Sequence, residues 1–333
     1  MTVGVAVGAA AEPLVDVHVH VYPDPEAGQQ AKDSYVIWEY GDDPGVTFCA
    51  SPGDVTALTS VYEKAGFDRA IVAHLFDTAL ARRQLAAHLP AAEAAEAAAD
   101  VLRASNRWIA RTVADSPVAE VLISIDPTVL GPRAITAHLA ELAGAGRTGA
   151  GGAGAGGAGA GGAGPGVAGV KLHPIVHSFI PNDARLHSMY EFCADAGLVV
   201  LSHSGPGRAG ARGSARPGDF APVLRKWPDL RLVLAHLGGA SWAETAALAA
   251  EFPRVAFDLS EVIEWVGAPN APTLADLSVL IKQIGADRVM LGSDFPWYDP
   301  LRTADRVAGL PGLSNSERAA ILGGTAIGFF GLA

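Results

Sequence analysis

The chain has 333 residues, 50% of them hydrophobic and 18% charged, and a formal net charge of −11 at pH 7. This length is enough for one large domain or two modest ones. Because the charge balance is acidic and no basic patch stands out, we expect no nucleic-acid partner.

The composition also indicates a location and argues against a membrane segment. The two cysteines, Cys49 and Cys193, are too few for a disulfide framework, so a reduced, cytoplasmic environment is the expected one. The first eleven residues are small and apolar but lack the basic segment of a signal peptide. The longest uncharged stretch, residues 148–170, is too rich in glycine for a transmembrane helix.

Short apolar runs alternate with amphipathic segments along the chain. The apolar runs predict eight strands, at residues 14–21, 69–75, 118–125, 169–173, 199–203, 232–236, 255–259 and 288–292. The amphipathic segments predict helices at residues 52–65, 90–114, 132–143, 183–196, 220–227, 242–251, 273–284 and 315–330. Eight such units predict a parallel sheet closed into a single (β/α)8 TIM barrel over residues 1–333. A doubly wound open sheet is the rival fold, but no glycine-rich nucleotide motif follows the first strand.

Two segments interrupt this pattern. Residues 22–51 form a long polar loop after the first strand and carry four aromatic residues, Tyr35, Trp38, Tyr40 and Phe48. In a barrel this loop belongs at the catalytic mouth, where it would serve as a lid or as the contact of a homodimer. Residues 144–166, just before the fourth strand, are almost entirely glycine and alanine. We expect this insert to be flexible and, because it lies at the end opposite the active site, catalytically idle.

The first strand carries the most informative pair of residues, His18 and His20. Side chains two positions apart in a strand point the same way and lie about 7 Å apart along it, so these imidazoles can bind one metal ion. A single pair of this kind is a weak signal, because two histidines at a strand end are more often structural.

The later strands strengthen the signal, because five of the eight predicted strands finish in His, Lys or Asp. Lys171 and His173 close the fourth strand, His203 the fifth and His236 the sixth, while Asp294 follows the eighth. In a barrel these C-terminal ends converge on one pocket. Neutral imidazoles and one carboxylate around a divalent cation, with a position left open for water, form a catalytic metal site.

As a set, these motifs identify a family. They comprise His-x-His in strand one, Gly-Val-Lys-Leu-His-Pro in strand four, single histidines ending strands five and six, and Gly-Ser-Asp-Phe-Pro-Trp after strand eight. The chain thereby resembles the amidohydrolase superfamily, in particular its amidohydrolase-2 (amidohydrolase-related) branch of metal-dependent TIM-barrel hydrolases and decarboxylases. The resemblance implies that His18, His20, His203 and Asp294 bind the metal. It also implies that His236 is an acid/base or oxyanion stabiliser and that Asp294 accepts a proton from the metal-bound water.

The expected cofactor is one divalent metal ion per chain, with Zn²⁺ as the leading candidate. Lys171 leaves three alternatives open: it binds a substrate carboxylate, it is carboxylated and bridges two metals, or it pairs with a buried acid such as Asp16. We favour the first. His173 and Trp297 are predicted to contact the substrate, whereas Asp258 in the seventh strand faces either the helices or the pocket.

The predicted function is hydrolysis of an amide, ester or lactone bond of a small organic substrate by a metal-activated water. The alternative is a lyase on the same scaffold, a metal-dependent non-oxidative decarboxylase of an aromatic or enolic carboxylic acid. The fold and the metal ligands cannot choose between these reactions. A third reading, a barrel that binds metal without turnover, is disfavoured because His236 and Asp294 are both present.

Overall fold

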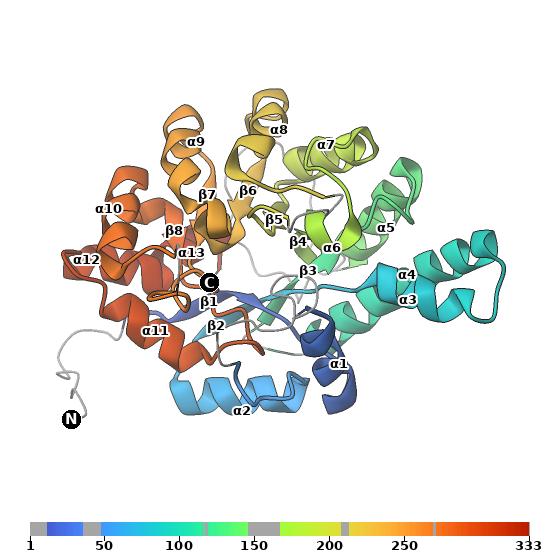
Figure 1. The fold of residues 1–333 in the computed structure, drawn as a ribbon, viewed down its shortest axis with the longest axis horizontal. Helices are drawn as coiled ribbons and strands as arrows, with labels where there is room; N and C mark the ends of the chain where they lie inside the picture. Colours follow the sequence, from blue (N-terminus) through green and yellow to red (C-terminus); the bar gives the residue numbers. More distant parts are fainter. Residues whose placement is uncertain are drawn as a thin grey trace, which may run out of the picture.

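The structure is a computed structural model that describes residues 12–35, 48–114, 116, 119–145, 167–207, 213–268 and 271–332. Its centre is an eight-stranded parallel sheet in which each strand pairs with the next along the chain (Figure 1). The strands are β1 (Val15–Val19), β2 (Arg69–Ala73), β3 (Ala119–Ser124), β4 (Val167–Leu172), β5 (Val199–Ser202), β6 (Arg231–Leu234), β7 (Ala256–Asp258) and β8 (Val289–Met290). All eight strands predicted from the sequence are confirmed.

The sheet closes between its first and last strands. The backbone N–H of Val17 donates to the carbonyl of Leu291 at 2.9 Å, and that of Asp294 donates to the carbonyl of His18 at 2.8 Å. This seam lies just past the two residues of β8. The predicted (β/α)8 barrel is therefore confirmed, and the rival open sheet is wrong.

Helices surround the barrel on the outside (Figure 1). The helices that match the predicted segments are α2 (Val55–Ala65), α4 (Ala91–Ala114), α5 (Pro132–Ala145), α7 (His187–Ala196), α8 (Ala221–Lys226), α9 (Thr245–Glu251), α10 (Leu274–Ile284), α12 (Asn315–Ala319) and α13 (Thr325–Phe330). Side-chain caps fix several of their first turns. Thr273 and Asp276, for example, form a reciprocal capping box at the start of α10.

The strands are buried on both faces, as their apolar runs predict. An inner cluster that includes Val17, Leu201 and Met290 fills the barrel, and a larger cluster packs the outer face of the strands against the helices. Removal of these side chains from water stabilises the fold. The polar side chains of the site lie instead at the C-terminal ends of the strands.

Four further helices were not predicted: α1 (Pro25–Tyr35), α3 (Thr78–Ala86), α6 (Pro174–His177) and α11 (Pro300–Ala308). The first corrects the expected loop at residues 22–51, whose first part is helical. Gly28 allows α1 to approach the chain closely, because a Cβ at this position would lie 1.8 Å from the carbonyl oxygen of Pro52. Residues 36–47 lie outside the described part of the chain.

The glycine-alanine insert is bounded by α5, which ends at Ala145, and by β4, which begins at Val167. Residues 146–166 lie outside the described part, so the insert's expected flexibility and catalytic idleness stay predictions. Among the described helices, none is both long and apolar enough to span a membrane.

Candidate metal centre and pocket

His18, His20 and Asp294 come together at the mouth of the barrel. The Oδ1 atom of Asp294 lies 3.0 Å from Nε2 of His20 and 3.5 Å from Nε2 of His18. All three side chains are buried, and their ligand atoms lie within 4.8 Å of one another. The converging strand ends predicted from the sequence thus place three of the four proposed ligands in one group.

These histidines are held in the neutral form. Burial lowers the pKa of the imidazoles of His18, His20 and His203, and the charge of Lys171 lowers each of them further. A neutral imidazole has the free lone pair that a metal ion requires.

Asp258 orients His18 from behind. Its Oδ2 atom lies 3.1 Å from Nδ1 of His18, while its Oδ1 atom accepts the backbone N–H groups of His236 and Ser260, both at 3.0 Å. Burial alone would raise the pKa of Asp258, but His18 and these hydrogen bonds hold it below the ordinary value. An ionised Asp258 accepts the Nδ1 proton of His18 and leaves Nε2 free toward the pocket. Of its two expected directions, Asp258 therefore points toward the mouth of the barrel, where it contacts His18, and not toward the helices.

Lys171 lies inside the same group. Its Nζ atom is 2.7 Å from Nε2 of His18, and the side chain is 1% exposed. Burial lowers the pKa of Lys171 to about 8, while Asp294 and Asp258 oppose the shift. The lysine is therefore a buried group at the reacting end of the barrel and is close to losing its proton near neutral pH.

The pairing of Lys171 with Asp16 is wrong. The carboxylate of Asp16 instead accepts hydrogen bonds from the hydroxyl of Tyr62 at 2.9 Å and from the backbone N–H groups of His18 and Ser293, at 3.1 and 2.9 Å. Burial raises its pKa to about 7 even though these hydrogen bonds lower it. Asp16 therefore ties β1 to the segment that carries Asp294.

His236 is positioned by residues that sequence reasoning missed. Its Nδ1 atom lies 2.9 Å from the hydroxyl and 3.2 Å from the carbonyl oxygen of Ser260, and 3.5 Å from Oε2 of Glu261. Its ring lies 5.2 Å from the ring of His18. Ser260 and Glu261 lie just after β7, separated from it by Leu259. The strand-end rule that located the histidines could have pointed to them.

Three residues of this site have left-handed backbone without being glycine. The φ angles are 60° at His236, 61° at Glu261 and 59° at Asp294. The ligand atoms of the same three residues lie within 4.8 Å of one another. Such conformations cost about 1–3 kcal/mol each and persist where the surroundings fix them, typically at functional sites.

His203 and His173 form a stacked pair, with ring centroids 4.1 Å apart. His203 also approaches His236, at 4.9 Å between rings, but it does not join the group of His18, His20 and Asp294 within 4.8 Å. Its assignment as a metal ligand therefore stays a prediction. The Nδ1 atom of His173 caps α6 by accepting the N–H of Val176 at 3.3 Å.

Aromatic side chains separate this site from a neighbouring cavity. The ring of Trp297 lies 5.1 Å from the ring of His20 and 4.8 Å from that of Tyr35, which in turn lies 6.1 Å from His173. Trp297 is 1% exposed, so it packs between the two spaces. The predicted contacts of His173 and Trp297 with a substrate stay predictions, and both residues lie where such contacts could form.

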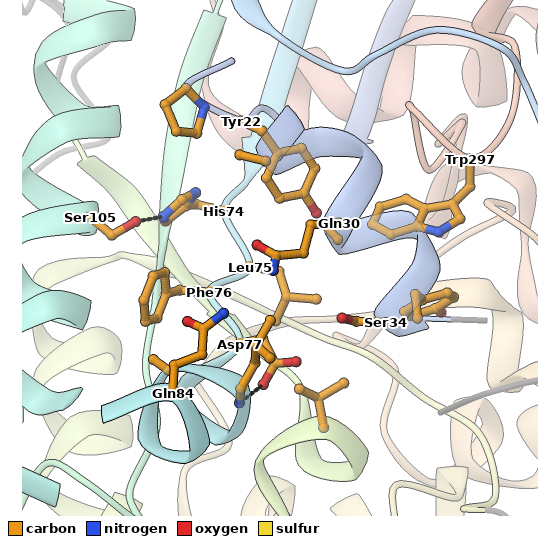
Figure 2. Close-up of a pocket in the computed structure, with 17 residues that line it drawn as sticks. Tyr22, Gln30, Ser34, His74, Leu75, Phe76, Asp77, Gln84, Ser105 and Trp297 are labelled. Carbon is orange, nitrogen blue, oxygen red and sulfur yellow. Dashed lines mark hydrogen bonds between the residues drawn. The ribbon is translucent and has the colours of Figure 1, made fainter. Parts of the chain in front are cut away.

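The cavity itself, which we call the mouth pocket, has a volume of about 210 Å³ (Figure 2). It lies between α1 and α3, at the C-terminal ends of the strands. Its wall is formed by Tyr22, which precedes α1, and by Gln30, Ser34 and other residues of α1. Side chains of the segment 74–84, Ser105, Val176 and Trp297 complete it. It adjoins the group of candidate ligands at Trp297, whose ring lies 5.1 Å from that of His20.

The residues present fit a divalent metal ion. Two imidazoles and a carboxylate form a donor set that suits zinc or manganese. The Oδ2 atom of Asp294 and the Nδ1 atom of His20 are buried and have no hydrogen-bond partner among the described residues. A buried carboxylate oxygen without a partner is costly unless a cation or a proton donor meets it.

A family model described as amidohydrolase matches residues 15–332. No curated protein matches the sequence.

Three solved structures illustrate the shared fold. The chain is similar to a 5-carboxyvanillate decarboxylase from Sphingomonas paucimobilis, with 17% identity, a TM-score of 0.60 and coverage of 97% of this chain and 100% of that one. It is also similar to a dihydroxybenzoic acid decarboxylase from Polaromonas sp. JS666 with bound manganese and the inhibitor 2-nitroresorcinol. That match has 15% identity and a TM-score of 0.63, and it covers 96% of this chain and 97% of that one. A third is an amidohydrolase from Burkholderia multivorans with bound zinc. Here the identity is 18% and the TM-score 0.61, with coverage of 96% of this chain and 100% of that one.

Proposed function

Because the chain belongs to the amidohydrolase family, we propose that it is a metal-dependent hydrolase of an amide, ester or lactone bond in a small organic substrate. The observation that carries the proposal is the buried group of His18, His20 and Asp294, with one carboxylate oxygen left without a partner. Zinc is the proposed metal, and two of the similar structures hold zinc or manganese.

The metal would be held by His18, His20 and Asp294, and by His203 if the family resemblance extends to it. When bound, a divalent ion lowers the pKa of water and polarises the bond to be cleaved. Asp294 has its Oδ2 atom available to accept a proton, since Oδ1 is the atom that faces the two histidines.

His236 is suited to the second proton transfer. Burial, together with His203 and His18, lowers its pKa well below the ordinary value, so the ring is neutral. Because Nδ1 lies 3.2 Å from the carbonyl oxygen of Ser260, that nitrogen carries the proton and donates it. Nε2 is then the acceptor that can take a proton from, or return one to, a substrate.

Lys171 is the charged group that would meet the substrate. It lies 2.7 Å from His18, and burial removes competing water. An ammonium in such surroundings binds a carboxylate or a developing oxyanion more strongly than it would in water.

The second candidate is the decarboxylase of an aromatic or enolic carboxylic acid. The observation that favours it is the same buried lysine, which could hold a substrate carboxylate next to the candidate ligands. Two of the similar structures are decarboxylases by name.

A single experiment tests both candidates. Metal-loaded enzyme is screened against lactones, esters, amides and aromatic acids, with released CO₂ and released acid measured in parallel. Acid release that requires zinc or manganese supports the hydrolase, whereas CO₂ release supports the decarboxylase. If neither product depends on metal for any substrate, both candidates are wrong.

A further inference from the structure

A second cavity lies at the end of the barrel opposite the mouth pocket, and we call it the base cavity. Its volume is about 330 Å³. It is lined by Arg231, which begins β6, by Ala256, which begins β7, and by Arg288, which directly precedes β8. Gly328 and Phe329 of α13 form another part of its wall. Because the candidate metal ligands lie at the C-terminal ends of the strands, the base cavity is separate from the metal centre.

The base cavity gathers positive charge in a protein that is acidic overall, with a formal net charge of −11. Its lining holds three arginines and two aspartates, namely Arg231, Arg254, Arg288, Asp229 and Asp287. Arg254 forms an ion pair with Asp229. Asp287 is exposed, and its charge opposes the lowering of the pKa of Arg288 by burial. Arg231 is therefore the cation that the lining does not balance.

Arg231 is held in place by neutral groups. Its Nη1 atom donates to the carbonyl oxygen of Gly197 at 2.9 Å, and its guanidinium lies 5.2 Å from the ring centroid of Phe329. The residue is half-buried, and it forms no ion pair with any residue that the structure describes. Burial lowers the pKa of Arg231, and no carboxylate opposes this shift. A partly dehydrated guanidinium has five N–H donors, of which the carbonyl of Gly197 accepts one, so the others are left for an anion.

Arg288 is fixed in its orientation by backbone carbonyl groups. Its Nη1 atom donates to the carbonyl oxygens of Ala249 and Phe252, at 3.0 and 3.3 Å, where α9 ends. Its Nε atom donates to the carbonyl oxygen of Ile284, the last residue of α10, at 2.9 Å. A ligand that meets Arg288 therefore does not have to order a flexible side chain, which lowers the entropic cost of binding.

We propose that the base cavity binds a phosphate group, carried by free inorganic phosphate or by a small phosphate ester. Guanidinium groups present parallel N–H donors that match the oxygens of a phosphate, and a doubly charged anion offsets the unbalanced charge of Arg231. A volume of about 330 Å³ leaves room beside the phosphate for a small organic group. The inference goes beyond the proposed function, because no step of that reaction uses this end of the barrel.

The test is a calorimetric titration of the full-length enzyme with inorganic phosphate, glycerol 3-phosphate and acetate. At about pH 8 the two phosphates carry nearly two negative charges and acetate carries one. Arg231→Gln removes the unbalanced cation and keeps a hydrogen-bonding side chain. Arg103→Gln removes the same charge at a half-buried position of α4 outside the lining, and it is the matched control.

A second pair of variants leaves all the arginines in place. A Cβ at Gly328 would meet no atom within 4 Å, so a side chain can enter the cavity there without a clash. Gly328→Glu adds a carboxylate to the base cavity, and Gly328→Gln is its uncharged control. Both substitutions replace a glycine of α13 by a better helix former, so neither should prevent folding.

We expect saturable binding of a phosphate that is at least about fivefold tighter than that of acetate. Arg231→Gln and Gly328→Glu should each weaken phosphate binding by about fivefold or more, while Arg103→Gln and Gly328→Gln stay within about twofold. Tighter binding of glycerol 3-phosphate than of inorganic phosphate identifies an ester as the ligand, and the reverse order identifies the free ion.

Three results would overturn the inference. They are the absence of saturable phosphate binding, binding of acetate as tight as that of the phosphates, and unchanged phosphate binding in a folded Arg231→Gln or in Gly328→Glu. The last result would place the anion elsewhere, for example at the metal centre. All the measurements are of binding, so they are independent of whether the enzyme shows the proposed activity.

Discussion

The Nζ atom of Lys171 lies 2.7 Å from Nε2 of His18, the same nitrogen that faces Asp294. Asp258 occupies the other nitrogen of that ring, so the Nε2 lone pair can accept only from Lys171 or bind a metal. A metal ion and the lysine ammonium would therefore compete for this one atom.

Replacing Lys171 tests which role it has. We expect Lys171→Met to retain about one zinc per chain and to raise KM by about tenfold or more, because a cation that binds substrate is lost while the ligands stay. Metal content is measured by plasma emission on protein purified without chelators. Two metals per chain in the natural sequence, with one lost in Lys171→Met, would instead support a carboxylated, bridging lysine.

Asp258 should control metal affinity although it does not face the metal. In Asp258→Asn the amide accepts the hydrogen bond from Nδ1–H of His18 more weakly than the carboxylate does. The imidazole ring is then held less firmly with its Nε2 lone pair toward the metal position. We expect zinc affinity to fall by about 10- to 100-fold in competition with a chelating dye. Asp195→Asn, at an exposed position of α7, is the control. An unchanged zinc affinity in Asp258→Asn would contradict the orienting role.

His236 should act on the substrate and not on the metal. We expect His236→Asn to keep its zinc and to lose about 10²-fold or more in kcat, the loss typical of a positioned acid or base. Asp294→Asn should lose at least as much activity and also hold metal more weakly. Both variants are assayed with the substrate found by the screen. If His236→Asn emptied the site, His236 would have to be counted among the ligands.

The burial of His74 predicts a pH-dependent loss of stability. The folded side chain stays neutral to about pH 3, whereas its ordinary pKa is 6.5, so the unfolded state binds more protons between these values. Stability therefore rises with pH across this window and is lost as the pH falls through it. When the pH is lowered from about 7.5 to 5, the free energy of unfolding falls in both proteins. We expect the fall to be about 2 kcal/mol smaller in His74→Gln than in the natural sequence.

This prediction is checked by urea denaturation of metal-depleted protein at both pH values. His88→Gln, at an exposed position, is the control. An equal effect in the two variants would show that His74 is not the source of the difference.

Much of the barrel could be predicted from the sequence because its strands are apolar on both faces. The run that contains Val15 and Val17 has no helical periodicity and is too short for a core helix, so it could only be a buried strand. Helix α1 was missed because its sequence is polar, and its position depends on a close backbone approach at Gly28 that no local pattern reveals.

The candidate site was predictable where it follows from topology. His18, His20 and Asp294 could be placed together because parallel strands of a barrel end on one face. The partner of Lys171 could not be deduced, because contacts across a barrel depend on the relative shift of its strands. Ser260 and Glu261 were missed since the left-handed turn at Glu261 is a conformation that its residue type disfavours.

The barrel closes where β1 meets the segment after β8, and that seam has His18 and His20 on one side and Asp294 on the other. Backbone hydrogen bonds that cross it join Val17 to Leu291 at 2.9 Å, Asp294 to His18 at 2.8 Å and His20 to Phe295 at 2.7 Å. An ion bound across the seam would act as a crosslink between the two ends of the folded chain, because it removes the loop-closure entropy of the opened state. Chelation would therefore remove this crosslink from the joint between the first and last strands, so that the loss of catalysis and the loss of this added stability would have one cause.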